Sequence, residues 1–164
     1  MPQQLIDTVG NPLNPVGDSP AKVGFAKVNA MFSELYSQVK PYNNVRVVGA
    51  VAAISSINAF TVGSQDGTFI IDANVLVTTA TTHAFTVTCA YTDEGGTART
   101  ATLSFTNLAG TAIVTSVANA TGAVPYQGMD IMIRCKAGTT ITIATTGTFT
   151  SVVYNIEASI QQVA

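Results

Sequence analysis

The first sign of a fold lies in residues 83–107, HAFTVTCAYTDEGGTARTATLSFTN, where apolar and small polar side chains alternate on either side of two glycines. In an extended strand, successive side chains point to opposite faces. One face of the first half therefore carries Phe85, Val87, Cys89 and Tyr91. Residues 93–97, DEGGT, offer glycine where a tight turn needs a positive φ. The stretch predicts two antiparallel strands joined by a hairpin tip.

The same period of two recurs through the rest of the chain after Tyr42, between turns rich in glycine. The predicted strands are 45–54, 57–62, 68–71, 74–79, 83–92, 98–107, 111–117, 129–135, 139–145 and 149–163. The last of them places one set of side chains on its core face: Val152, Tyr154, Ile156, Ala158 and Ile160. Many short strands with no helix between them predict a mainly β protein, an antiparallel sandwich or jelly roll.

The chain before these strands has a different character. Residues 1–16, with Gly10, Pro12 and Pro15, predict an extended arm. Residues 17–40 predict one helix, and residues 41–164 predict the β domain. Within the helix, apolar residues recur every three or four positions as a stripe: Ala21, Phe25, Val28, Phe32, Leu35 and Val39.

This stripe has to be covered, because an isolated helix of about 20 residues is only marginally stable in water. Two interpretations stay open from the residues alone. The helix packs on its own domain, or it docks on copies of itself or on a different protein.

Charged residues make up only 10% of the chain, against the roughly 25% of an average soluble protein. A monomer so poor in charge exposes wide neutral surfaces, so we expect an oligomer. The net charge of -2 and the pI of about 5.1 favour neither nucleic acid nor an anionic membrane as a partner. The N-terminus lacks the basic and hydrophobic blocks of a signal peptide, which favours synthesis in a cytoplasm.

Residues with catalytic or metal-binding potential are few and scattered. His83 is the single histidine, and no nucleophile elbow accompanies it. Asp93 and Glu94 are adjacent, so their carboxylates diverge and a solvated turn explains them better than an acid/base pair. Asp66 lacks the regularly spaced oxygen ligands of a calcium loop.

The two cysteines, Cys89 and Cys135, belong to no CxxC pair and have no ligand histidine beside them, so we expect buried free thiols. We expect no metal and no cofactor.

Two further functions are weighed and ranked lower. Five aromatic residues can form a glycan patch, although core packing is the favoured interpretation: Tyr42, Phe60, Tyr91, Tyr126 and Tyr154. An enzyme that cleaves polysaccharide needs a pair of carboxylates, and its sources are few: Asp66, Asp72, Asp130 and Glu157. We expect no enzymatic activity.

Residues 17–36, GDSPAKVGFAKVNAMFSELY, resemble the N-terminal attachment segment of many tailed-bacteriophage tail fibres, neck appendages and other virion proteins. That segment typically reads G-D-x-x-x-x-A-F-x-K-I-N-x-N-F-x-E-L-Y. The matching residues are Gly17, Asp18, Phe25, Lys27, Asn29, Phe32, Glu34, Leu35 and Tyr36. Gly24, Val28 and Ala30 depart from it, where alanine, isoleucine and a second asparagine are usual.

The C-terminal two thirds is similar to a phage structural module in residues 90–105, 133–143 and 147–163. This resemblance implies a tumour-necrosis-factor-like jelly roll, a fold that commonly trimerises. The two resemblances together imply a virion structural protein, a homotrimeric head fibre or capsid decoration protein assembled in the host cytoplasm. The residues expected to anchor it or to form its oligomer are Phe25, Val28, Asn29, Phe32, Leu35 and Tyr36.

The expected partners are other copies of the chain and a major capsid, portal, neck or tail protein. The alternative is a tail fibre or tail-fibre adaptor whose exposed loops bind a host-surface glycan.

Overall fold

A computed structural model describes residues 27–32, 42–80, 82–107, 113–118 and 123–163. The chain divides into two compact units, Met1–Lys40 and Pro41–Ala164. Within the first unit, residues 27–32 form a helix, inside the range where the sequence predicts one. The predicted arm and the remainder of the predicted helix lie outside the described residues.

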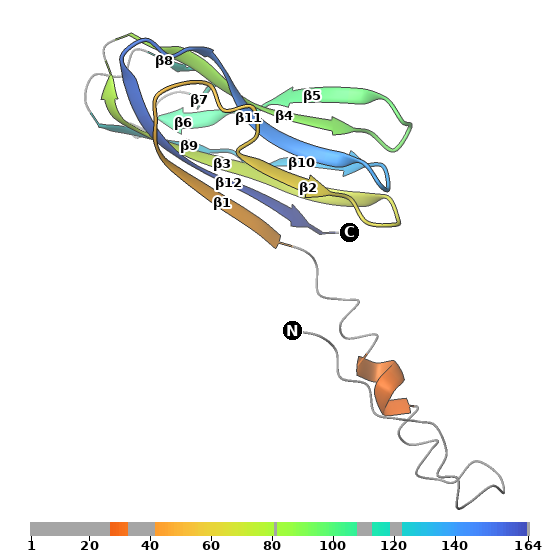
Figure 1. Ribbon diagram of the computed structural model, residues 1–164. Helices are drawn as coiled ribbons and strands as arrows, with labels where there is room; N and C mark the ends of the chain where they lie inside the picture. Colours follow the sequence, from red (N-terminus) through yellow and green to blue (C-terminus); the bar gives the residue numbers. More distant parts are fainter. Residues whose placement is uncertain (1–26, 33–41, 81, 108–112, 119–122, 164) are drawn as a thin grey trace, which may run out of the picture. The chain divides into compact units, whose positions relative to one another are not determined.

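The second unit is a sandwich of two antiparallel sheets (Figure 1). The seven-stranded sheet runs in the order β1 (Tyr42–Ala50), β12 (Val152–Gln162), β3 (Gly67–Ala80), β9 (Val124–Gly128), β6 (Phe105–Asn107) and β7 (Ile113–Val114), with β10 (Ile131–Cys135) also paired to β3. The five-stranded sheet runs in the order β2 (Asn58–Thr61), β11 (Thr140–Thr148), β4 (Ala84–Thr92) and β5 (Ala98–Thr102), with β8 (Val117–Ala118) also paired to β4.

The connections between the sheets define the topology. The chain crosses between the sheets from β1 to β2, from β2 to β3, from β3 to β4 and from β11 to β12. Three consecutive pairs stay within one sheet: β4 and β5, β6 and β7, and β9 and β10. The order β1-β12-β3-β9 in one sheet faces β2-β11-β4-β5 in the other. Two interleaved Greek keys of this kind make a jelly roll, which confirms the fold predicted from the sequence.

The core lies between the sheets and follows the predicted alternation. Phe85, Val87 and Cys89 of β4 are buried, and so are all five residues predicted for the inner face of β12. Phe85 packs against Tyr154 with ring centroids 4.8 Å apart and stacks on Phe149 at 4.9 Å. The Tyr154 hydroxyl donates to the carbonyl oxygen of Ala52 at 2.8 Å and lies 3.0 Å from the Thr145 hydroxyl, so its polar end is satisfied inside the core.

A buried asparagine joins the start of β1 to both sheets. Asn58, in β2, is 2% exposed, and its amide donates to the carbonyl oxygens of Asn43 and Ala158 at 3.1 and 2.9 Å. The Asn43 amide donates back to the Asn58 side-chain oxygen at 2.6 Å. We call this group the Asn58 clamp. It links β1, β12 and β2 through side-chain hydrogen bonds that the sheet ladders do not supply.

Several strand boundaries differ from the predicted ones. Residues 68–71 and 74–79 belong to one strand, β3, because Asp72 fits the alternation as an outward-facing residue. Residues 98–107 instead form two strands in different sheets. Between them, Leu103 is fully buried and its N–H donates to the carbonyl oxygen of Val87 at 2.9 Å.

Candidate functional site

The described helix presents apolar side chains to solvent. Val28 is 36% exposed and Phe32 is 43% exposed. Both belong to the predicted stripe, whereas Met31, which is 68% exposed, lies off it. Asn29 is half-buried. The other three predicted anchoring residues, Phe25, Leu35 and Tyr36, lie outside the described residues.

Three inter-strand loops meet at one end of the β domain (Figure 1). These loops are β2–β3, β4–β5 and β10–β11. In or beside them lie Asp66, Asp93, Glu94, Arg99, Arg134 and Lys136. We call this group the charged loop end. The two strands predicted from residues 83–107 meet here, and their tip forms at 93–97 as predicted.

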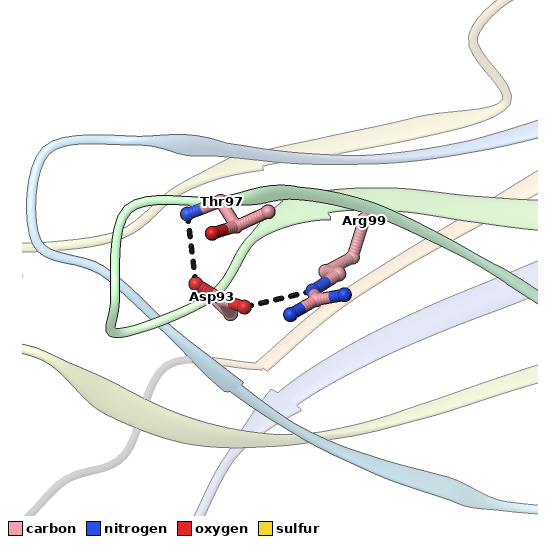
Figure 2. Close-up of polar contacts among 3 residues, drawn as sticks. All are labelled: Asp93, Thr97 and Arg99. Carbon is pink, nitrogen blue, oxygen red and sulfur yellow. Dashed lines mark hydrogen bonds and ion pairs between the residues drawn. The ribbon is translucent and has the colours of Figure 1, made fainter.

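Asp93 organises this tip (Figure 2). Its carboxylate accepts from the Thr97 N–H and from Nε of Arg99, both at 2.8 Å. The Arg99 hydrogen bond, followed by the backbone hydrogen bond from Thr97, lowers the pKa of Asp93. Gly96, with φ of 84°, supplies the positive φ of the turn. Asp93 therefore has a structural role, and the predicted solvated turn is what the structure shows.

Two further contacts hold the neighbouring loops. Asp66 accepts from the Ala137 N–H at 2.8 Å, which makes it a cap for the β10–β11 loop. Glu94 forms an ion pair with Arg134 at 2.9 Å, between side chains 47% and 69% exposed. Exposed pairs of this kind contribute about 0.2–1 kcal/mol, so they orient the loops more than they stabilise the fold.

A second feature is a concavity of about 560 Å³ on the outer face of the seven-stranded sheet. Leu76 and Pro125 lie at neighbouring positions of β3 and β9 on this face. Its polar rim consists of Arg46, Asn74, Thr106, Gln127, Asn155 and Glu157. Backbone contacts hold the two asparagines, since Asn74 accepts from the Gly128 N–H and Asn155 from the Gly49 N–H. This concavity could not be predicted from the sequence, because its residues come from five separate strands.

The histidine and the two cysteines are all buried. His83 is 1% exposed, burial lowers its pKa, and neither ring nitrogen has a hydrogen-bond partner among the described residues. Cys89 and Cys135 are free and buried, and desolvation raises their pKa values to about 12 and about 11. They are thus the unreactive thiols expected from the sequence.

Of the carboxylates weighed for polysaccharide cleavage, Asp72 lies close enough to Asp130 and Glu157 to interact with both. Burial raises the pKa of Asp72, with the Asp130 carboxylate as the next cause. Asp66 lies at the charged loop end, where its carboxylate accepts a hydrogen bond from the Ala137 N–H. Across the described part of the chain, no cluster of three or more histidine, cysteine or acidic residues could hold a metal ion. No helix within the same residues is long and apolar enough to cross a membrane.

The aromatic residues weighed for a glycan patch are distributed between core and surface. Tyr154 and Tyr126 are buried, while Tyr91 and Phe60 are half-buried and pack against the core. Only Tyr42 of the five is exposed, at 61%. Core packing therefore accounts for most of this set.

Comparison with known proteins identifies no family. No protein-family description matches the sequence, and no curated protein matches it. Among solved structures, the SPBc2 prophage-derived protein YomS is similar at 14% identity and a TM-score of 0.35, over 74% of this chain and 96% of that one.

Two other similar structures differ in origin. A chain in the structure of infectious bursal disease virus, Gt strain, is similar at 11% identity and a TM-score of 0.31, over 76% of this chain and 42% of that one. The xylanase 10B CBM22-1–GH10 modules of Clostridium thermocellum, complexed with xylohexaose, are similar at 13% identity and a TM-score of 0.30, over 75% of this chain and 24% of that one. Likeness at this level assigns no function.

Proposed function

We propose that this chain is a non-enzymatic structural protein of a bacteriophage virion. In this proposal it is a short head fibre or capsid decoration protein, assembled in the host cytoplasm as a homotrimer. Its N-terminal arm and helix bind a major capsid, portal, neck or tail protein, and the jelly roll projects from the particle. Neither nucleic acid nor a membrane is a partner.

The observation that carries this proposal is the exposed stripe on the described helix. Val28 and Phe32 present apolar surface within a segment that resembles phage attachment segments. Large exposed apolar side chains at helical spacing are typical of helices that dock into a groove on a partner.

Loading onto particles tests the attachment. We expect Phe32→Ser to reduce incorporation of the full-length protein into particles at least about tenfold, because a buried aromatic anchor is worth 2 kcal/mol or more at an interface. The matched control is Met31→Ser, which removes a more exposed apolar side chain that lies off the stripe. Quantitative immunoblotting of purified particles measures both. Equal loading of the two variants would contradict the proposed tether.

The charged loop end favours a second candidate, a tail fibre or adaptor that binds a host-surface glycan. Three loops meet there, and Arg134 and Glu94 are both exposed. In this case a glycan array probed with the full-length protein should give binding that Arg134→Ala abolishes and that Lys27→Ala, in the N-terminal unit, leaves intact. Particle images should then place the protein on the tail. If the protein binds no glycan, the glycan-binding candidate is contradicted and the head-fibre proposal remains.

A further inference from the structure

The outer face of the seven-stranded sheet carries large exposed apolar side chains. Val48 is 67% exposed, Leu76 36%, Ile113 65% and Met132 69%. The registers place three of them on this one face, because Leu76 lies beside Asn155, Met132 beside Ile70 and Ile113 beside Thr106. Single exposed apolar residues are ordinary on a protein surface, but several on one face indicate a contact surface.

The outer face of the five-stranded sheet has the opposite composition. Every outward position of its paired strands is threonine or alanine: Ala59, Thr61, Ala84, Thr86, Thr88, Ala90, Thr92, Ala98, Thr100, Thr102, Ala118, Thr140, Thr142, Ala144, Thr146 and Thr148. Protein interfaces are enriched in methionine, arginine and aromatic residues and depleted of alanine and serine. By this measure, Met132 and Arg46 favour the seven-stranded face as an interface and the alanines count against the other face, whereas its threonines count neither way.

Charge on the seven-stranded face is self-complementary. Arg46 and Glu157 are direct cross-strand neighbours on β1 and β12, and both border the concavity. Among the described residues no ion pair engages Arg46, whereas Glu157 accepts from the Asn44 amide at 2.7 Å. Around a three-fold axis, the arginine of each copy can lie against the glutamate of the next copy. A surface with a single sign of charge would repel its own copy.

The size of the face is also sufficient. Strands lie about 4.8 Å apart and rise about 3.3 Å per residue, so this face spans roughly 800 Å². A stable interface buries about 800 Å² on each partner. We infer that the outer face of the seven-stranded sheet, centred on the concavity at Leu76, is the surface through which copies of this chain associate. This inference rests on the proposed homotrimer and names the face that forms it.

The test compares lysine substitutions on the two sheets of the full-length protein. Leu76→Lys places a cation at the centre of the inferred contact, and like charges forced together across an interface cost several kcal/mol. We expect it to weaken assembly at least about a hundredfold, as measured by sedimentation equilibrium over a concentration series. The matched control is Thr88→Lys, also at an outward position of a central strand, between Ala144 and Thr102. It should assemble like the unsubstituted chain.

A second variant covers the case in which Leu76→Lys disturbs folding. Met132 is 69% exposed, so Met132→Lys leaves the fold unchanged in circular dichroism, and we expect it also to weaken assembly at least about tenfold. If Leu76→Lys and Met132→Lys both assemble normally, or if only Thr88→Lys dissociates, the inferred face is wrong. The proposed homotrimer is not contradicted by either result. If the unsubstituted chain is a monomer at micromolar concentration, the proposed homotrimer itself is wrong, and this inference fails with it.

Discussion

Replacing Phe85 with alanine is expected to lower the free energy of unfolding by about 3–5 kcal/mol. Phe85 is 1% exposed and touches three other rings: His83, Phe149 and Tyr154. Its removal leaves a cavity between the two sheets, and close-packed neighbours on paired strands cannot collapse into it. Since domains are stable by only about 5–15 kcal/mol, the loss is a large share of the total.

Urea unfolding followed by circular dichroism measures this effect, at a protein concentration held constant between variants because assembly adds to apparent stability. The control is Thr88→Ala on the same strand, an outward position at which we expect a change within about 0.5 kcal/mol. A Phe85→Ala protein that unfolds at nearly the same urea concentration as the control would mean that the sheets do not pack through this cluster.

Gly147→Ala is the second substitution with a large expected effect. Gly147 has φ of 137°, a backbone conformation that L-residues with a side chain rarely adopt. An added Cβ would also lie 2.7 Å from Cα of Phe85 and collide with the carbonyl oxygen of Ala84. Strained backbone costs about 1–3 kcal/mol, and the collision with the β4 backbone adds to it. We expect a total loss of at least about 3 kcal/mol in the free energy of unfolding.

Gly63→Ala is the matched control for this glycine. Gly63 is exposed, its φ lies outside the positive region, and nothing lies within 4 Å of an added Cβ. Alanine there is expected to change the unfolding free energy by less than about 1 kcal/mol. Comparable unfolding midpoints for the two alanine variants would show that β11 and β4 are not held together at Gly147 as the structure has them.

The alternation of side chains was enough to predict an antiparallel sandwich or jelly roll. In β4 and β12 the inward residues are large and apolar and the outward ones small or polar, so period two is unambiguous and both faces are correct. The hairpin tip at 93–97 was equally readable, because its glycines and aspartate have local conformational reasons to be there. Local signals of this kind can be interpreted without knowledge of the tertiary structure.

Signals that depend on tertiary context were missed. Residues 124–128 form β9, whereas the sequence predicts no strand between 111–117 and 129–135. Pro125 is tolerated because β6 pairs with β9 only from Tyr126 to Gly128, so no ladder there needs its N–H. Gly128 is required because a side chain would collide with the Ala73 carbonyl and the Asp72 carboxylate. Neither cause is visible in the sequence of β9 itself.

The candidate sites were predictable to different degrees. The helical stripe could be named residue by residue, and its described members Val28 and Phe32 are exposed. The concavity and the two contrasting outer faces could not be predicted, because they depend on which strands are neighbours. Arg46 and Glu157 are far apart in the chain and adjacent only through the pairing of β1 with β12. Asn58, read simply as part of a strand, has its role only once β1, β12 and β2 meet.

The Asn58 clamp has a mechanical consequence under the proposed attachment of this chain by its N-terminal segment. Any pull on the leading segment enters the jelly roll at Tyr42 and meets the Asn43–Asn58 hydrogen bonds one residue later. Since Asn58 also holds the carbonyl of Ala158, the load is shared among β1, β2 and β12. An edge strand held only by backbone hydrogen bonds can separate from its sheet one bond at a time. In β1, the hydrogen bonds between Asn43 and Asn58 oppose this separation at the end where the force is applied.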